Sequence, residues 1–353
     1  MIYLQLNPLT NNTKMEIKNI FLHHIDVANS LITEIKVIED SANLNTYIES
    51  LVKDILDNPN RRFYNWKDGD TEVKNSLDPL KEIGNESEKY ALNNAKRLLE
   101  KESKAQEQVN KMNVEMQKGS LLHLSIESDG THKTIICKVE HDEVMNEVNF
   151  EYIRGLNTRK KLFKAILIYY NSNGQIEHNY VHDKNSSKYW WDDFLELEPI
   201  ITDDDNTENS LNEIDKCLTR YRKKYYVDYL ILRNSFLGHF RNRDTLNFSD
   251  LVNDVFKNYT PLNKQFPKDR LLASINKLPE KNLFDTTFNI AKNKINKRKK
   301  TSIRLASNLF LNIDDFVENL KNLIDLEQKN GNKYVRIKSE DGYDKLEDLL
   351  NKL

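Results

Sequence analysis

The sequence predicts an α+β fold, with a central antiparallel sheet flanked by helices, followed by a helix-rich C-terminal region with a few terminal strands. Three observations predict it. An apolar run at residues 162–170 and an alternating run at 175–181 surround Asn173-Gly174, which is the strongest short-range signal for a β-hairpin. Further short apolar segments precede this hairpin. Segments with helical periodicity lie before and after them.

The first segments of the chain predict two strands and a helix. Residues 17–25 (IKNIFLHHI) and 31–38 (LITEIKVI) are short, apolar and rich in β-branched side chains. Apolar residues then recur at spacings of three and four through residues 41–57, which is typical of an amphipathic helix.

Two further helices are expected before the central sheet. One spans residues 73–83, with a break before Pro79, and the other spans 87–116. The second is long and polar, so it either bridges two lobes or packs on a partner chain. Residues 61–70 (RRFYNWKDGD) predict a loop that anchors its aromatic side chains in the core. The alternative is a platform on which nucleic acid stacks.

The middle of the chain predicts a meander of about five antiparallel strands in one sheet. Three short strands, at 121–126, 134–139 and 148–153, lead with short connections into the hairpin at 162–181. The WWDDF segment after the hairpin is expected to anchor its aromatic pair, Trp190-Trp191, in the core. Its two aspartates point in different directions, as neighbouring residues do.

An acidic stretch, residues 201–209 (ITDDDNTEN), predicts a structureless linker. We therefore expect a leader at 1–14, an α+β domain at 15–200, the linker, and a helix-rich domain at 210–353 with a basic segment and terminal strands. Within the last domain the pattern predicts helices at 210–226, 229–240, 247–256 and 268–278. It also predicts helical spacing at 314–328, strands at 303–313 and 334–337, and a turn at Asp341-Gly342 before a short acidic helix.

Composition excludes several classes of protein. The 53 Lys and Arg residues nearly balance 55 Asp and Glu residues, so the net charge of −2 does not by itself indicate a nucleic-acid partner. Cys137 and Cys217 fit no disulfide or zinc spacing and are expected to be free thiols. No apolar run approaches 18 residues, so we expect a cytoplasmic protein without a membrane partner.

No catalytic motif is evident. The sequence contains no phosphate loop, dinucleotide fingerprint, GxSxG or HExxH, and we expect no cofactor and no metal. A metal-dependent nuclease needs paired carboxylates, often with a lysine. The nearest such group is Lys138 and Glu140 with Asp142 and Glu143. The common alternative is that these are charged residues at a strand end.

Local clusters of cations are the stronger functional signal, because Lys and Arg at phosphates supply sequence-independent affinity for nucleic acid. The sharpest asymmetry lies in residues 286–304, which contain seven cations and no acid. These seven are Lys292, Lys294, Lys297, Arg298, Lys299, Lys300 and Arg304. Two further clusters comprise Arg154, Arg159, Lys160, Lys161 and Lys164, and Arg220, Arg222, Lys223 and Lys224. The alternative for each cluster is an ordinary solvated face.

The order of segments resembles the family of 37-kDa nucleoid-associated proteins of bacteria. The resemblance rests on NIFLHHID, on Lys118-Gly119-Ser120-Leu121, on KKLFKAILIYY after a basic turn, and on the loop that leads to KYWWDDFLELEP. It extends over residues 16–342. It implies a cytoplasmic, nucleoid-localised, non-enzymatic DNA-binding protein and carries over no DNA-contacting residue.

The sequence therefore predicts largely sequence-independent binding of double-stranded DNA without catalysis, with a homo-oligomer or other nucleoid proteins as further partners. The alternatives are a metal-dependent nuclease or phage-defence effector that acts on DNA, and a scaffold that binds proteins through residues 87–116. Neutralising Lys297, Arg298, Lys299 and Lys300 is expected to weaken duplex binding and its salt dependence. Whether residues 61–66 contact nucleic acid stays open.

Overall fold

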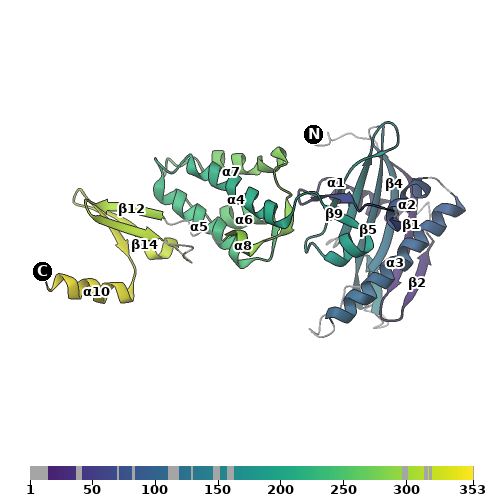
Figure 1. Cartoon of the computed structure of the whole chain (residues 1–353), viewed down its shortest axis with the longest axis horizontal. Helices are drawn as coiled ribbons and strands as arrows, with labels where there is room; N and C mark the ends of the chain where they lie inside the picture. Colours follow the sequence, from purple (N-terminus) through teal and green to yellow (C-terminus); the bar gives the residue numbers. More distant parts are fainter. Residues whose placement is uncertain are drawn as a thin grey trace. The chain divides into compact units, whose positions relative to one another are not determined.

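The computed structural model describes residues 15–36, 42–69, 71–81, 84–109, 119–128, 130–145, 152–156, 163–295, 301–313, 317 and 320–352. The predicted leader at 1–14 lies outside these residues. The chain forms two compact units (Figure 1). The first contains the residues up to Asn206, with 247–249 and 284–289, and the second contains the rest.

The first unit contains an antiparallel sheet, which confirms the predicted fold class. Its strands follow the order β2-β1-β4-β5-β7-β8-β3-β9, and β6 pairs with β5. The strands are β1 (Met15–Asp26), β2 (Leu31–Ile35), β3 (Arg62–Trp66), β4 (Gly119–Ser128), β5 (Thr131–Met145), β6 (Tyr152–Leu156), β7 (Phe163–Tyr170), β8 (Ile176–His182) and β9 (Leu197–Pro199).

The predicted meander forms the centre of this sheet, because β4, β5, β7 and β8 are neighbours in order. The β7–β8 hairpin turns at Gly174, whose φ of 74° favours glycine. Strand β5 is long enough to pair with β7 through residues 133–139 and with β6 through residues 141–145. The sequence did not predict that β1 and β2 extend the same sheet beyond β4.

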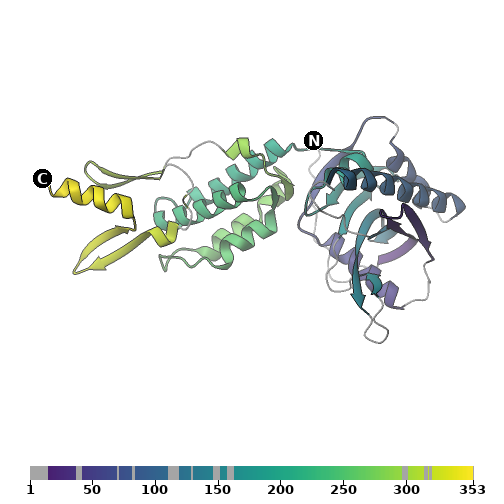
Figure 2. The same cartoon turned by 90° about the horizontal axis from the view of Figure 1, so that it is seen from below.

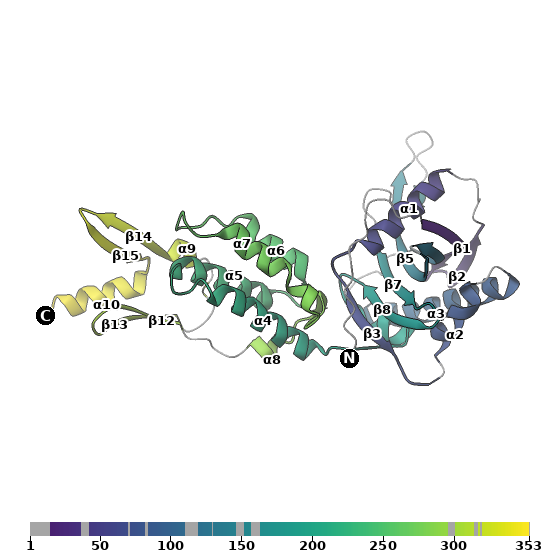
Figure 3. The same cartoon turned by 90° about the horizontal axis from the view of Figure 1, so that it is seen from above.

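Helices cover both faces of the sheet (Figure 3). On one face α1 (Ala42–Leu56) packs against apolar side chains of β4, β5 and β7. On the other face lie α2 (Glu72–Lys81) and α3 (Asn85–Val109), together with a π-helical turn at Tyr189–Phe194. Trp190 and Phe194 are fully buried there, so the WWDDF segment anchors the core as predicted.

Two predictions for the first half of the chain are wrong. The loop predicted over residues 61–70 is wrong for residues 62–66, because β3 pairs there with β8 and β9, although Tyr64 is buried in the core as predicted. Helix α2 continues through Pro79 without a break before it. The helix predicted at 87–116 is present as α3 in its described part, and its Ala95 and Leu98 lie in the core under the sheet. Contact of this helix with a partner chain stays a prediction.

The acidic stretch 201–209 is not a structureless linker, because α4 (Asp203–Thr219) begins inside it. Three consecutive aspartates fill its first turn, where the positive end of the helix dipole favours them. The Thr202 hydroxyl accepts from Asp205 N at 3.1 Å. Asp203 also pairs with the buried Arg62 at 2.8 Å. The acidic residues of this stretch therefore form the first turn of a helix, and one of them, Asp203, is the ion-pair partner of Arg62.

Helices dominate the next part of the chain, as predicted, and several run side by side (Figure 2). After α4 come α5 (Tyr226–Asn242), α6 (Phe248–Lys257), α7 (Lys268–Asn276), a 3₁₀ turn at Leu278–Lys281, and α8 (Lys292–Ile295). Two short strands, β10 (Thr245–Asn247) and β11 (Thr287–Asn289), pair with each other.

Two hairpins and a helix make up most of the described C-terminal segment. The elements are β12 (Thr301–Ala306), β13 (Leu309–Ile313), α9 (Leu320–Leu323), β14 (Ile324–Lys329), β15 (Asn332–Ile337) and α10 (Glu340–Leu350). The helix predicted over 314–328 is wrong after Leu323, because residues 324–329 alternate and pair with β15. Asp341-Gly342 lies inside α10 rather than in a turn, and Ser339 caps that helix by accepting from Gly342 N at 3.0 Å.

Candidate nucleic-acid interface

The first lysine of the basic run, Lys292, is exposed, but its ammonium group is engaged by the end of a helix. Its Nζ donates to the carbonyl oxygens of Phe240 at 3.2 Å and Arg241 at 2.9 Å, and also to that of Arg243. These carbonyls belong to the C-terminal end of α5, where unpaired carbonyls and the helix dipole attract a cation. Lys292 therefore caps a helix, and its role as a DNA contact is not supported.

The other six cations of the run differ in what surrounds them. Lys294 forms an ion pair with Glu208 at 3.8 Å. Arg304 lies on β12, exposed, with its Nε donating to Ala306 O at 3.2 Å. Lys297, Arg298, Lys299 and Lys300 lie outside the described residues. Of the three described cations of the run, Lys292 and Arg304 are exposed and Lys294 is half-buried, and each of them has a polar partner within the chain.

The structure describes only one side chain, that of Lys164, of the cationic cluster at residues 154–164. Arg159, Lys160 and Lys161 lie outside the described residues, as does the side chain of Arg154. Lys164 is buried, and its Nζ donates to Asp183 Oδ1 at 2.9 Å and to Ser187 Oγ at 3.1 Å. Lys164 cannot also reach a phosphate at the surface, so its assignment to a DNA-binding cluster was wrong.

The turn between α4 and α5 brings the third cluster together at the surface of the second unit. The chain reverses over residues 220–224, with backbone bonds from Tyr221 N to Leu218 O and from Arg222 N to Thr219 O. Tyr221 and Tyr225 pack against Phe266, at ring distances of 5.5 and 5.4 Å. The alternation of tyrosine and cation in RYRKKY thus fixes the turn through its aromatic rings.

The four cations of this turn, Arg220, Arg222, Lys223 and Lys224, all lie exposed. Among the residues that the structure describes, no carboxylate forms an ion pair with any of them. Arg222 and Lys223 line an open hollow with Thr219 and Tyr226, two residues that the sequence did not single out. The arrangement concentrates four positive charges within five consecutive residues, and no carboxylate of the described part of the chain is paired with them to compete with a bound anion. We call these four side chains the basic turn.

The aromatic side chains beside the basic turn and in the RRFYNW segment are buried or half-buried, so none of them presents a fully exposed ring for stacking. Tyr225 is buried in the second unit, and Tyr64 of the RRFYNW segment is buried in the first. Arg62 of the same segment is buried between Asp203 and Asp285, at 2.8 and 3.8 Å. Binding of single strands relies on exposed aromatic rings that stack on bases. The basic turn is instead suited to the phosphates of a backbone.

Lys138, the lysine of the nuclease hypothesis, is only 1% exposed. Its Nζ donates to Glu102 Oε1 of α3 at 2.5 Å, and the Tyr189 hydroxyl donates to the same oxygen at 3.4 Å. The side chains of Asp142 and Glu143 lie outside the described residues. The pair with Glu102 makes Lys138 part of the interior, where it cannot position a nucleic acid.

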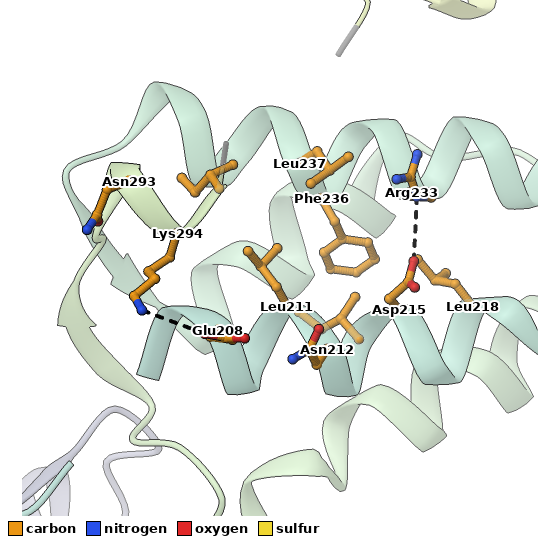
Figure 4. Close-up of a pocket in the computed structure, with 12 residues that line it drawn as sticks. Glu208, Leu211, Asn212, Asp215, Leu218, Arg233, Phe236, Leu237, Asn293 and Lys294 are labelled. Atoms are coloured by element: carbon orange, nitrogen blue, oxygen red, sulfur yellow. Dashed lines mark ion pairs between the residues drawn. The ribbon is translucent and has the colours of Figure 1, made fainter. Parts of the chain in front are cut away.

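A small apolar pocket of about 170 Å³ lies between α4, α5 and α8 (Figure 4). Leu211, Phe236 and Leu237 line it, and the Lys294–Glu208 and Arg233–Asp215 pairs lie at its rim, the latter at 3.5 Å. Its volume is close to that of an engineered cavity that holds one benzene molecule. It is smaller than a typical substrate site, so it does not by itself indicate an enzyme.

Within the described ranges, no group of three or more His, Cys, Asp or Glu side chains is placed to hold a metal ion. Both cysteines are free and buried, as expected. In the same ranges, no helix combines the length and the apolar character that a membrane crossing requires. No family model matches the chain, and no curated protein matches it. The resemblance to nucleoid-associated proteins therefore stays a prediction.

Proposed function

We infer that the chain is a non-enzymatic protein that binds double-stranded DNA with little dependence on sequence. The observation that supports this function is the basic turn, with four exposed cations that have no carboxylate partner among the described residues. Cations at phosphates provide most of non-specific affinity for DNA. Because the net charge is only −2, such a local patch determines where a polyanion is attracted.

The chemistry of the patch favours the duplex backbone over bases. Arginine contacts phosphate with a planar fork of donors, and lysine contacts it as a mobile point charge. Neither contact distinguishes one base pair from another. The exposed Arg304 and the cations at 297–300 are additional candidate phosphate contacts. Association with the nucleoid would follow from such binding in a bacterial cell.

Fluorescence anisotropy with a labelled duplex of arbitrary sequence tests the proposal. The wild-type chain is expected to bind at low salt, and the combined substitutions Arg220→Gln, Arg222→Gln, Lys223→Gln and Lys224→Gln are expected to weaken binding about 100-fold or more. A second duplex of unrelated sequence is expected to bind with similar affinity. Wild-type protein that retains no duplex at low salt would contradict the proposed function.

The same protein sample distinguishes the nuclease alternative. Purified protein is incubated with supercoiled plasmid and Mg²⁺ or Mn²⁺, and the non-enzymatic proposal predicts intact plasmid. Nicking that disappears on Glu140→Ala would favour the nuclease instead, because Glu140 is the half-buried carboxylate nearest to Lys138 in sequence. Chelation with EDTA is expected to leave duplex binding unchanged, because phosphate contacts by lysine and arginine need no metal.

A further inference from the structure

The C-terminal segment exposes most of the large apolar side chains that the structure finds at the surface. Of sixteen such exposed residues among the described part of the chain, eleven lie between residues 301 and 352. They are Leu305, Leu309, Phe310, Leu326, Tyr334, Val335, Ile337, Tyr343, Leu346, Leu349 and Leu350. In the same described segment only Leu320 is buried. These strands and the helix α10 therefore have regular structure without a core of their own.

The hairpin β14–β15 has one apolar and one polar face. Ile324 is paired with Ile337 and Leu326 with Val335, so these four side chains share one face of the hairpin. The opposite face is mostly polar, with an ion pair between Arg336 and Glu327, and it also carries Tyr334. Leu326, Val335 and Ile337 are 43 to 49% exposed, so the apolar face is uncovered.

Helix α10 is amphipathic in the same way. Tyr343, Leu346 and Leu350 recur at spacings of three and four, which places them on one side of the helix. Asp344 and Asp348 lie on the opposite side by the same geometry. Tyr343 and Leu350 are 64 and 67% exposed, and α10 buries no residue.

These elements need a partner surface. An isolated two-stranded hairpin is marginally stable in water, and a helix of 11 residues is too short to be stable alone. The two apolar faces together carry six exposed side chains, three on the hairpin and three on α10, which expose on the order of 600 Å². This approaches the ~800 Å² that one protein contributes to a standard interface. An apolar patch of this size marks an interaction surface.

The charges beside the two apolar faces indicate which partner fits. Glu347 flanks the apolar side of α10, and Lys333 lies on the apolar face of β14–β15, in line with Val335 and Ile337. Among the described residues neither forms an ion pair. One segment thus carries both an acidic apolar helix and a basic apolar hairpin. A two-fold interface requires this kind of self-complementarity, because each surface must meet its counterpart on an identical chain.

We propose that the C-terminal segment is a dimerisation module, in which α10 of one copy covers the apolar face of β14–β15 of a second copy, and the reverse. The wild-type chain is expected to have twice its monomer mass of 41.6 kDa in multi-angle light scattering, from low micromolar concentrations upward. The sample is treated with nuclease and measured at high salt, so that two chains bound to one DNA molecule are not mistaken for a dimer. A monomer mass over the whole concentration range would overturn the proposal.

Glutamine substitutions test the role of the apolar face without lowering helix propensity much. Leu346→Gln with Leu350→Gln is expected to weaken dimerisation at least ~1,000-fold, because two leucines per copy lose their burial. The matched control, Asp344→Gln with Asp348→Gln, changes the opposite side and is expected to remain a dimer. Circular dichroism verifies that both variants keep the rest of the fold. A dimer that survives the leucine substitutions contradicts the proposal.

A charge exchange identifies the occupant as a second copy. The substitutions Glu347→Lys and Lys333→Glu are made in separate chains. In a homodimer of either variant, residues 347 and 333 of opposite copies carry the same charge at both contacts. Each substitution is therefore expected to weaken dimerisation roughly tenfold. Mixing the two variants places opposite charges together at both contacts, so a mixed dimer is expected to predominate. Native mass spectrometry measures this with variants of different mass. Random mixing, or dimers unaffected by either change, would contradict the proposed contact.

Discussion

Lys292 Nζ donates to the Arg241 carbonyl oxygen at 2.9 Å, at the C-terminal end of α5. The residue that begins the most basic run of the sequence is thus engaged within the fold. The cations at 220–224 received less emphasis in the sequence analysis. They lie together at the surface and pair with no carboxylate among the residues that the structure describes. A count of charges along the chain does not distinguish a helix cap from a ligand contact, whereas the position of each nitrogen does.

Replacing Lys292 is expected to lower stability rather than DNA affinity. Lys292→Gln removes a charged donor from several carbonyls of α5, and the free energy of unfolding is expected to fall by about 1 kcal/mol. Urea unfolding measures this change. Lys223→Gln serves as the control and is expected to leave stability within about 0.5 kcal/mol. An unfolding midpoint unchanged by Lys292→Gln would contradict the capping role.

The buried pair of Lys138 and Glu102 gives a second prediction. Lys138→Met leaves the Glu102 carboxylate buried without its cation, which is expected to cost about 3–5 kcal/mol of unfolding free energy. Adding Glu102→Gln removes the uncompensated charge, and the side-chain oxygen of the glutamine can still accept the hydrogen bond from the Tyr189 hydroxyl. The double variant is therefore expected to recover most of the loss.

Equilibrium unfolding in urea measures the wild type, the Lys138→Met and Glu102→Gln single variants and the double variant, and the interaction energy follows from this double-mutant cycle. A single variant as stable as the wild type would mean that Lys138 is not held in the interior. DNA affinity is expected to be unchanged in each variant. This result would distinguish the structural role of the Lys138–Glu102 pair from the proposed DNA-binding role of the basic turn.

Buried histidines are expected to make the first unit less stable in mild acid. Burial lowers the pKa of His123 to about 3 and that of His182 to about 4. Asn94 Nδ2 faces His123 Nε2 at 3.2 Å, and an amide nitrogen can only donate, so the contact requires a neutral imidazole. In the unfolded chain both rings have an ordinary pKa of about 6.5.

The sign of the effect follows from these values. Below about pH 6.5 both histidines become protonated in the unfolded chain but stay neutral in the folded chain. The free energy of unfolding therefore falls by roughly 1.4 kcal/mol per pH unit for each histidine, until the ring in the folded chain is also protonated. Asp285 acts in the opposite direction, because burial raises its pKa to about 6 and the folded state gains its proton first. Burial also lowers the pKa of His23, His132 and His178, so the histidines outweigh Asp285 and a net loss of stability is expected between pH 6 and 4.5.

A variant isolates the contribution of His123. His123→Gln has no titrating ring, and its stability is expected to decrease less steeply than that of the wild type over the same pH range. Urea unfolding at intervals of half a pH unit measures both slopes. Identical slopes would show that His123 is not a buried neutral group in the folded chain.

Local patterns predicted the elements with short-range signals. Alternation around Asn173-Gly174 predicted β7 and β8, and apolar periodicity predicted α1 and α5. The order of strands depends on contacts far apart in sequence, such as that between Phe63 and Tyr180, which no local pattern contains. The RRFYNW segment was therefore assigned to a loop although it pairs with β8 and β9.

The candidate site was predicted in part. The four cations at 220–224 were identified as a cluster, and their exposure follows from the tyrosines between them, which pack inward against Phe266. Lys164 was placed in a DNA-binding cluster because its sequence neighbours are basic, yet Asp183, 19 residues later, pairs with it across the β7–β8 hairpin. Ion pairs between distant residues decide which cations are available, and sequence alone does not show them.

The salt dependence of duplex binding tests the central claim most directly. The logarithm of the association constant is measured against the logarithm of salt concentration for the wild type and for the variant with glutamine at Arg220, Arg222, Lys223 and Lys224. A control of equal charge change replaces Lys53, Lys74, Lys89 and Lys96, which are exposed lysines of the first unit. All three proteins are compared with one duplex at one pH.

The basic turn predicts a slope for its variant that is smaller by about 2 to 4, because each phosphate contact contributes about 0.9 to the slope. The control is expected to keep the slope of the wild type. Equal slopes for the wild type and the basic-turn variant, or an equal reduction in the control, would contradict the assignment of DNA binding to Arg220, Arg222, Lys223 and Lys224.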